Sequence, residues 1–292
     1  MLRDLIIGLS IGSAYSLLAV AVVLIYSSTK VLSLAVGEIG AFALYVALRW
    51  HERGWFGWHP SVFVCALLTI VGAGALGLLV ERLVMRPMVG RPALDTLVAT
   101  LVVALLLALS ELAIYGINPF AAPSPVGHGT VRLLGATVSA TQVTALLLAG
   151  FVAVALWLFL TRTSFGLATR AVTGDATVAR LLGVKVNRVY VFAWGVGGLL
   201  SGAAAALLAP ISGSLTPFSL TTALLSALAG AVIGGLDSLG GAIVGSLLVG
   251  LVTSVVGSRV DPTTSAGVIF LAVLVTLLVR PQGLLGGARA SA

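Results

Sequence analysis

The chain has 292 residues, of which 59% are hydrophobic and 9% are charged, and its mean hydropathy is +1.17. Ordinary soluble domains carry about 25% charged residues, so this chain has too little polar surface for a water-soluble globule of its size. A soluble enzyme, a disordered chain and a nucleic-acid-binding domain are therefore excluded. The net charge of +7 comes from cations scattered between apolar runs, which is typical of loops beside anionic lipid and not of a nucleic-acid groove.

Nine apolar segments predict an all-α, polytopic helix bundle in the lipid bilayer, because a spanning helix needs about 20 mainly apolar residues. We expect one transmembrane domain over residues 1–292 with eight or nine crossings, some of the segments being broken or re-entrant. In chain order the segments are 5–26, 31–49, 60–80, 94–115, 141–161, 190–211, 221–236, 241–257 and 264–280.

Three cation-rich segments between these helices indicate the cytoplasmic side, since Lys and Arg concentrate in cytoplasmic loops. Segments 50–59, 116–140 and 258–263 then face outward. If segments 5–26 and 31–49 both span the membrane, Arg3 is outside and Lys30 is inside; if 31–49 is re-entrant, the two cations exchange sides. The number of cations on each side is the same in both cases, so charge does not decide on which side the N-terminus lies. The cations of the three segments are Arg82, Arg86 and Arg91; Arg162, Arg170, Arg180, Lys185 and Arg188; and Arg280 and Arg289.

Small residues recur at a spacing of four in three of the segments, which predicts close helix packing. Such faces let backbones approach each other in lipid, where no hydrophobic drive exists between helices. The faces are Gly8, Gly12 and Ser16; Gly198, Gly202 and Ala206; and Ala242, Ser246 and Gly250.

Two segments, 33–40 and 234–241, place an acid among glycines within apolar surroundings. Glycine permits a backbone break, and broken backbone at membrane depth occurs where it is buried in protein or lines a watery cavity. One such segment in each half of the chain is typical of transporters built from two repeats around a central path. We expect the following residues to border the substrate path: Gly37, Glu38, Gly234, Gly235, Asp237 and Ser238.

Glu38 and Glu111 fall inside predicted spans, whereas Asp95 lies at the very start of the segment 94–115. Intramembrane acids often mark ion or substrate pathways. Glu111 lies near the outer end of its segment, and we expect it at the membrane interface. Glu38 is the better pathway candidate, and its alternative role is to accept hydrogen bonds from a helix start.

The sequence offers no catalytic, cofactor-binding or metal-binding motif. Lys30 and Lys185 follow Thr29 and Val184, whereas a P-loop requires a lysine directly after glycine. We therefore expect a transport protein and not an enzyme, with no cofactor and no metal. Such a protein is a facilitator, an ion-driven carrier, or the membrane subunit of a multi-protein pump.

The long loop 162–189 favours the pump subunit. It is predicted to be cytoplasmic, and it carries five cations with Asp175 as its only acid. Its pattern predicts a short amphipathic helix within 166–184 that stops at Gly183. A partly apolar helix at the membrane face suits docking into a groove on a soluble partner.

Five blocks, in order, resemble the branched-chain amino acid permeases of ABC importers, of the LivH type. They are GLSIGSAYSLLAVAVVLIYSSTKVLSLAVGEIGAF (8–42), ERLVMRPMVGRPALDTLVATL (81–101), the loop 162–189, GGLDSLGGAIVGSLLVG (234–250) and LLVRPQGLLG (277–286). Within the loop, the resemblance marks an ATPase-coupling pattern that includes Arg170, Asp175, Ala179, Arg180, Leu182 and Gly183.

The resemblance implies a bacterial inner-membrane permease that moves substrate by alternating access. It implies a second permease subunit (LivM-like, or a second copy in a homodimer), two cytoplasmic ATPase subunits and an extracytoplasmic substrate-binding protein. The resemblance implies a branched-chain or related amino acid as the substrate. Val36 departs from the pattern, because the family often has histidine at this place before its Gly-Glu pair, and this departure keeps urea and short amides as alternatives. A self-sufficient carrier driven by ions or gradients is the alternative from another class.

Overall fold

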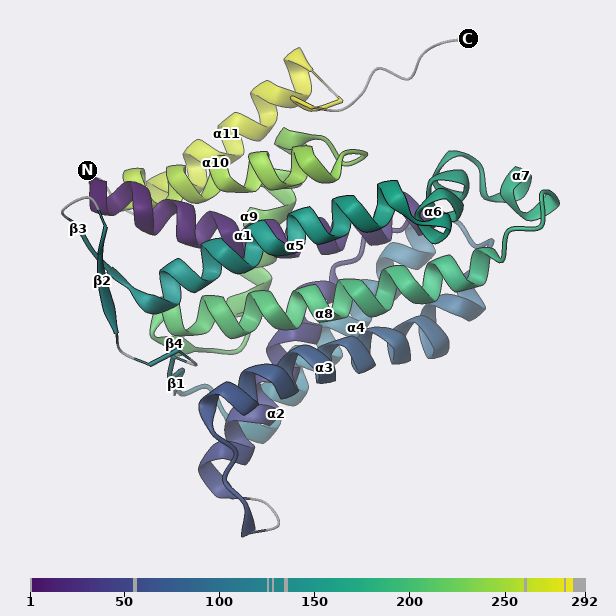
Figure 1. Ribbon diagram of the computed structural model, residues 1–292. Helices are drawn as coiled ribbons and strands as arrows, with labels where there is room; N and C mark the ends of the chain where they lie inside the picture. Colours follow the sequence, from purple (N-terminus) through teal and green to yellow (C-terminus); the bar gives the residue numbers. More distant parts are fainter. Residues whose placement is uncertain are drawn as a thin grey trace.

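Helices α1 (Leu2–Thr29) and α8 (Val186–Ser212) pack side by side at the centre of a helical bundle (Figure 1). The computed structural model describes residues 2–54, 57–124, 126–127, 129–133, 136–259, 262–280 and 282–285. Around the central pair lie α2 (Ala35–Arg53), α3 (Val62–Val80), α4 (Ala93–Tyr115), α5 (Ala140–Arg162), α9 (Ser219–Gly234), α10 (Leu239–Gly257) and α11 (Pro262–Val279). The π-helix η2 (Glu81–Met85) and the 3-10 helix η3 (Arg86–Met88) extend α3.

Within the described residues, six helices are long and apolar enough to cross a membrane: α1, α3 with its extension, α4, α5, α8 and α10. Helix α9 and the Thr264–Val279 part of α11 are apolar but shorter. Helix α2 is mostly buried although it carries Glu38, Arg49, Glu52 and Arg53. The prediction of an all-α membrane bundle is therefore confirmed.

Four short strands depart from the purely helical expectation. Strand β1 (Phe120–Ala121) pairs with β4 (Ser214–Leu215), and β2 (Thr130–Leu133) pairs with β3 (Ala136–Ser139), both antiparallel. They lie at the end of the bundle opposite to α6 (Ser164–Gly174) and α7 (Ala176–Leu181) (Figure 1). We refer to these two ends as the strand end and the α7 end.

The predicted small-residue faces of α1 and α10 pack against each other. A Cβ atom added at Gly8 would lie 2.9 Å from Leu251 Cα, and one at Gly12 would lie 2.8 Å from Leu247 Cα. On α8, a Cβ at Gly202 would lie 2.7 Å from the Thr69 carbonyl oxygen of α3. The four-residue spacing thus lets these helix backbones touch, as van der Waals packing between membrane helices requires.

The first predicted break lies earlier than expected. Residues 30–34 are non-helical, and α2 begins at Ala35, so Gly37 and Gly40 sit inside a regular helix. These glycines serve close packing: a Cβ at Gly37 would lie 2.9 Å from the Leu220 carbonyl oxygen, and one at Gly40 would lie 2.5 Å from that of Ser201.

The second predicted break falls as expected. Helix α9 ends at Gly234, and Gly235 adopts a φ of 113° that favours glycine. Ser238 then caps α10, because its hydroxyl accepts a hydrogen bond from the Gly241 N–H at 3.0 Å.

Both of the first two predicted segments run from one end of the bundle to the other. Arg3 lines a cavity with Thr130 and Gln142 at the strand end, whereas Lys30 lines one with Arg86 and Arg91. Helix α2 returns to the strand end, since Tyr45 packs against Phe120 there. The alternative in which 31–49 is re-entrant is therefore not what the fold adopts.

Candidate functional site

Glu38 caps the start of α9 from the first turn of α2. Its side chain is 1% exposed, and its Oε1 accepts a hydrogen bond from the Thr221 hydroxyl. The Thr221 backbone N–H also interacts electrostatically with this carboxylate. The residue that precedes α9, Phe218, has a φ of 68° and provides no side-chain cap. Glu38 supplies the missing acceptor at the positive end of the helix.

Glu111 lies beside Glu38, in the last turns of α4. It is 0% exposed, so it is buried within the protein and does not face solvent; the expected level at the membrane interface stays a prediction. Glu38, Glu111 and the Tyr45 hydroxyl are close enough to interact electrostatically. Both Glu111 carboxylate oxygens, Glu38 Oε2 and the Tyr45 hydroxyl have no hydrogen-bond partner among the described residues. We call Glu38, Glu111 and Tyr45 the acidic site.

The spacing of small and polar residues along α4 indicates that Glu111 is buried, although the polarity of glutamate alone would suggest an exposed position. The buried residues of α4 are Thr96, Thr100, Ala104, Ala108 and Glu111. Their spacing of three or four residues defines one helix face, and its members are small or polar between exposed leucines. Glu111 thus continues a face that turns toward protein, while five leucines of α4 are exposed elsewhere on the helix: Leu94, Leu101, Leu105, Leu106 and Leu109.

The buried carboxylates of the acidic site suit a proton or a cation. Neither Glu38 nor Glu111 forms a salt bridge within the described part of the chain. A buried carboxylate without a partner is costly and calls for a proton or a cation. Tyr45 stacks on Tyr115 at 5.0 Å, and the Arg49 guanidinium lies 5.8 Å from the Tyr115 ring centre. These groups place the acidic site toward the strand end.

A two-helix segment projects from the opposite end of the bundle (Figure 1). The single helix expected within 166–184 is instead α6 followed by α7, because the chain is extended at Asp175 with φ −152°. The Asp175 carboxylate accepts hydrogen bonds from the backbone N–H groups of Thr177 at 2.7 Å and Val178 at 3.0 Å. These donors hold the pKa of Asp175 below its usual value, the Val178 contact first.

The tip of this segment exposes apolar side chains. Val178, Leu181 and Leu182 are 51%, 83% and 77% exposed. Arg180 is exposed beside them, whereas Ala179 is buried against Val172, Val186 and Val189. Gly183 ends the helix in the left-handed region with φ 85°, as the sequence predicts. Val178, Leu181 and Leu182 thus form an exposed apolar surface beside the positive charge of Arg180. We call these four residues the α7 tip.

Comparison with known proteins decides the family. The chain matches the family described as "Branched-chain amino acid transport system / permease component" over residues 5–278. The chain belongs to this family. The relatives that it resembles include the BraD permease protein of Pseudomonas aeruginosa, at 28% identity over 98% of this chain and 95% of the relative. LivH of Escherichia coli K12 is 27% identical over 98% and 95%, and a probable LivH of Methanocaldococcus jannaschii is 29% identical over 92% and 88%. No solved structure matches the chain.

The predicted path residues of this permease lie in two separate places. Gly37 and Glu38 lie at the start of α9, but Gly234, Gly235, Asp237 and Ser238 lie at its far end. Helix α9 has 16 residues, so about 24 Å separates the two groups. The Lys30 ammonium lies 3.9 Å from the Asp237 carboxylate at the α7 end.

The second group lies beside the segment that carries the coupling pattern. A cavity of about 380 Å³ separates α1 and α5 from α6 and the start of α10, and Arg170, Asp237 and Ser238 line it. The structure therefore brings Arg170 to the 234–241 turn. Glu111 and Tyr45 are the acidic-site residues that the sequence reasoning did not assign to the path.

Proposed function

We propose that this chain is the membrane-spanning permease subunit of an ATP-driven importer in the bacterial inner membrane. The observation that carries the proposal is the α7 tip, in which Leu181 and Leu182 stand almost fully exposed beyond the bundle (Figure 1). Exposed leucines of this kind mark a protein-binding surface. Membership of a transport-permease family supports the same function, and ATP hydrolysis belongs in this proposal to separate partner subunits.

The orientation follows from charge. With the cation-rich segments in the cytoplasm, the α7 end is cytoplasmic and the strand end faces outward. Arg3 and the N-terminus are then outside, and Lys30 is inside. This places the α7 tip within reach of a cytoplasmic ATPase, and it places strands β1 to β4 where an extracytoplasmic binding protein delivers substrate.

The partners are two ATPase subunits, a binding protein, and a second permease subunit that is either LivM-like or another copy of this chain. ATP-driven closure of the ATPases moves the α7 tip. Ala179 transmits this movement to α8 through its contacts with Val186 and Val189. Arg170 and Arg180 are exposed on the segment and guide docking by charge.

The substrate is a branched-chain or related amino acid. Names of several relatives describe high-affinity branched-chain amino acid transport. The acidic site supports a substrate with an ammonium group, because Glu38 and Glu111 have no cationic side chain of the described residues against them. Urea and short amides are neutral and leave both acids uncompensated, so the acidic site favours the amino acid.

The test is uptake into proteoliposomes that contain this permease with its ATPases, its binding protein and, for the heterodimer, its second permease subunit. We expect ATP-dependent accumulation of a labelled branched-chain amino acid, and no accumulation by this chain alone. Charge reversal of Arg170 and Arg180 should reduce co-purification of the ATPases while the permease still inserts into the membrane. Accumulation by the isolated permease would instead identify a carrier driven by ions or gradients, and accumulation of urea in preference to amino acids would overturn the substrate.

A further inference from the structure

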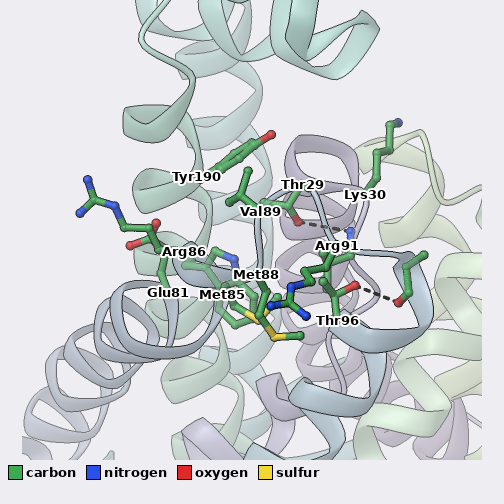
Figure 2. A pocket seen from close by; sticks show the side chains of 14 residues that line it. Thr29, Lys30, Glu81, Met85, Arg86, Met88, Val89, Arg91, Thr96 and Tyr190 are labelled. Carbon is green, nitrogen blue, oxygen red and sulfur yellow. Dashed lines mark hydrogen bonds between the residues drawn. The ribbon is translucent and has the colours of Figure 1, made fainter.

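A second cavity, of about 170 Å³, lies at the α7 end between the end of α1, residues 81–93 and the first turns of α8. Figure 2 shows its lining from close by. Its charged and polar lining includes Lys30, Glu81, Arg86, Arg91, Tyr190 and Trp194. The acidic site at the opposite end of the bundle does not share these residues.

The lining is rich in hydrogen-bond donors and positive charge. Lys30, Arg86 and Arg91 line the cavity with one acid, Glu81, although the Lys30 ammonium lies 3.9 Å from Asp237 outside the cavity. Glu81 interacts electrostatically with Arg86 and with Arg82, which is also outside the cavity. Arg91 forms no salt bridge to any residue that the structure describes. Trp194 is 1% exposed, and its indole N–H has no acceptor. Because an indole N–H can only donate, this wall of the cavity lacks an acceptor that a bound anion would provide.

The remaining wall is apolar, so the ligand has an apolar part as well. Val31, Met85, Met88 and Val89 contribute it. The cavity also lies where the candidate span Val62–Met88 ends and the span Ala93–Tyr115 begins, which is the level of the lipid headgroups. Basic cavities between membrane helices on the cytoplasmic side suit anionic headgroups.

We propose that this cavity binds the headgroup phosphate of an anionic phospholipid from the cytoplasmic leaflet. The phosphate lies against Arg91 and the Trp194 N–H, Arg86 adds positive charge from the side of Glu81 (Figure 2), and the first part of the acyl chains lies against Met85 and Met88. This inference rests on the orientation given under the proposed function. It goes beyond that function because the ligand is a lipid and not the transported solute.

The cavity adjoins the segment that supports the α7 tip. Tyr190 lines the cavity, and it also packs against the cluster formed by Val172, Ala179, Val186 and Val189. A lipid bound here contacts the same part of α8 that holds Ala179.

The first test compares lipid retention by native mass spectrometry of the complete transporter. Wild type should retain phosphatidylglycerol in preference to phosphatidylcholine. The double variant Arg86→Gln/Arg91→Gln should retain it about 25-fold less well, since each cation near the surface contributes about 1 kcal/mol. Arg82→Gln is the matched control, because Arg82 is exposed on the same segment and does not line the cavity. Equal retention by the double variant and the control would overturn the proposal.

The second test locates the lipid with a variant that keeps Trp194 as its one tryptophan out of five. Phosphatidylglycerol with brominated acyl chains should quench Trp194 fluorescence in nanodiscs, and brominated phosphatidylcholine should not. Arg86→Gln/Arg91→Gln in this background should abolish the difference. If inorganic phosphate alone displaces the quenching lipid at low concentration, or if both lipids quench equally, a lipid-specific site is excluded. The orientation and transport can hold even when this test fails, because uptake is measured separately.

Discussion

The Thr221 hydroxyl donates a hydrogen bond to Oε1 of Glu38, and this contact joins the first turn of α2 to the first turn of α9. The two residues are 183 positions apart in the chain. Two helices from different halves thus begin at the same place in the bundle. Glu38 contacts the start of α9 and also forms part of the acidic site, so its structural role and the proposed substrate-binding role are compatible.

The two roles of Glu38 can be separated by changing one partner at a time. Glu38→Gln keeps a side-chain oxygen that can accept the hydrogen bond from Thr221, but it removes the negative charge. We expect uptake to fall, by about tenfold for each 1.4 kcal/mol of transition-state stabilisation that the charge provides. Thr221→Val removes the hydroxyl donor and keeps the charge, so it should lower the melting temperature more than it lowers uptake. Labelled amino-acid uptake and thermal unfolding check both. Equal uptake by wild type and Glu38→Gln would leave capping as the role of this residue.

Replacing Glu111 with leucine should stabilise the permease and impair transport. An apolar side chain removes two buried carboxylate oxygens that have no partner, and such a group costs about 1–3 kcal/mol. We expect Glu111→Leu to raise the melting temperature in detergent while uptake falls. Glu111→Gln, which keeps a polar group, should lose uptake without the gain in stability. A lower melting temperature with normal uptake in Glu111→Leu would assign Glu111 a purely structural role.

Gly40 should tolerate no side chain. A Cβ atom there would lie 2.5 Å from the Ser201 carbonyl oxygen of α8, so Gly40→Ala must separate α2 from α8 at a cost of about 1–3 kcal/mol. Gly150 in α5 is the matched control, since a Cβ there meets nothing within 4 Å. Gly150→Ala should be neutral or slightly stabilising, because alanine favours helix. Melting temperatures of the two variants measure the difference, and similar values would contradict the close contact.

The α7 tip should lose its partner when its apolar surface is charged. Leu182→Asp places a charge on a side chain that is 77% exposed, so it should abolish ATPase co-purification with little effect on the melting temperature. Thr177→Asp adds the same charge at another exposed position of α7, near the helix start where acids are favourable. This control should keep the ATPases bound. Loss of binding in both variants would indicate a general charge effect.

The Asp175 cap should withstand moderate acid. Its pKa is lowered by hydrogen bonds from the Val178 and Thr177 backbone N–H groups, so its contribution is present above the ordinary Asp pKa of about 3.9 and is lost as pH falls through the lowered value. The NMR shifts of these two amides should therefore change only below that ordinary value. Asp175→Ser should keep α7 ordered and Asp175→Ala should not. A midpoint above the ordinary pKa would contradict the cap.

The helices and their close contacts could be predicted from the sequence because both depend on local spacing. Apolar length predicted α1 to α11 apart from the two helices of the coupling segment. Small residues at every fourth position predicted which faces of α1 and α10 pack closely, but not that these two helices are partners. The cap at Ser238 likewise follows from serine placed just before a helix.

The acidic site could not be predicted in full, because it depends on which helices become neighbours. The residues near Glu111 in the sequence do not indicate that the packing of α2 and α9 places Glu38 beside it. The position of the first break was also wrong, since glycine signals either a break or a close approach. Gly37 and Gly40 serve the second purpose, and only the neighbouring Leu220 and Ser201 distinguish the two.

The last described residues complete the end of α9. The Leu284 N–H donates to the Ile233 carbonyl oxygen at 2.8 Å, and the Leu285 N–H donates to that of Gly234 at 3.0 Å. During synthesis, these two carbonyl oxygens have no such donors until Leu284 and Leu285 have been made, about 50 residues later and after α10 and α11. The bundle therefore closes at its α7 end only once translation has reached Leu285. A chain that ends before Leu284 leaves the Ile233 and Gly234 carbonyl oxygens without these two backbone donors.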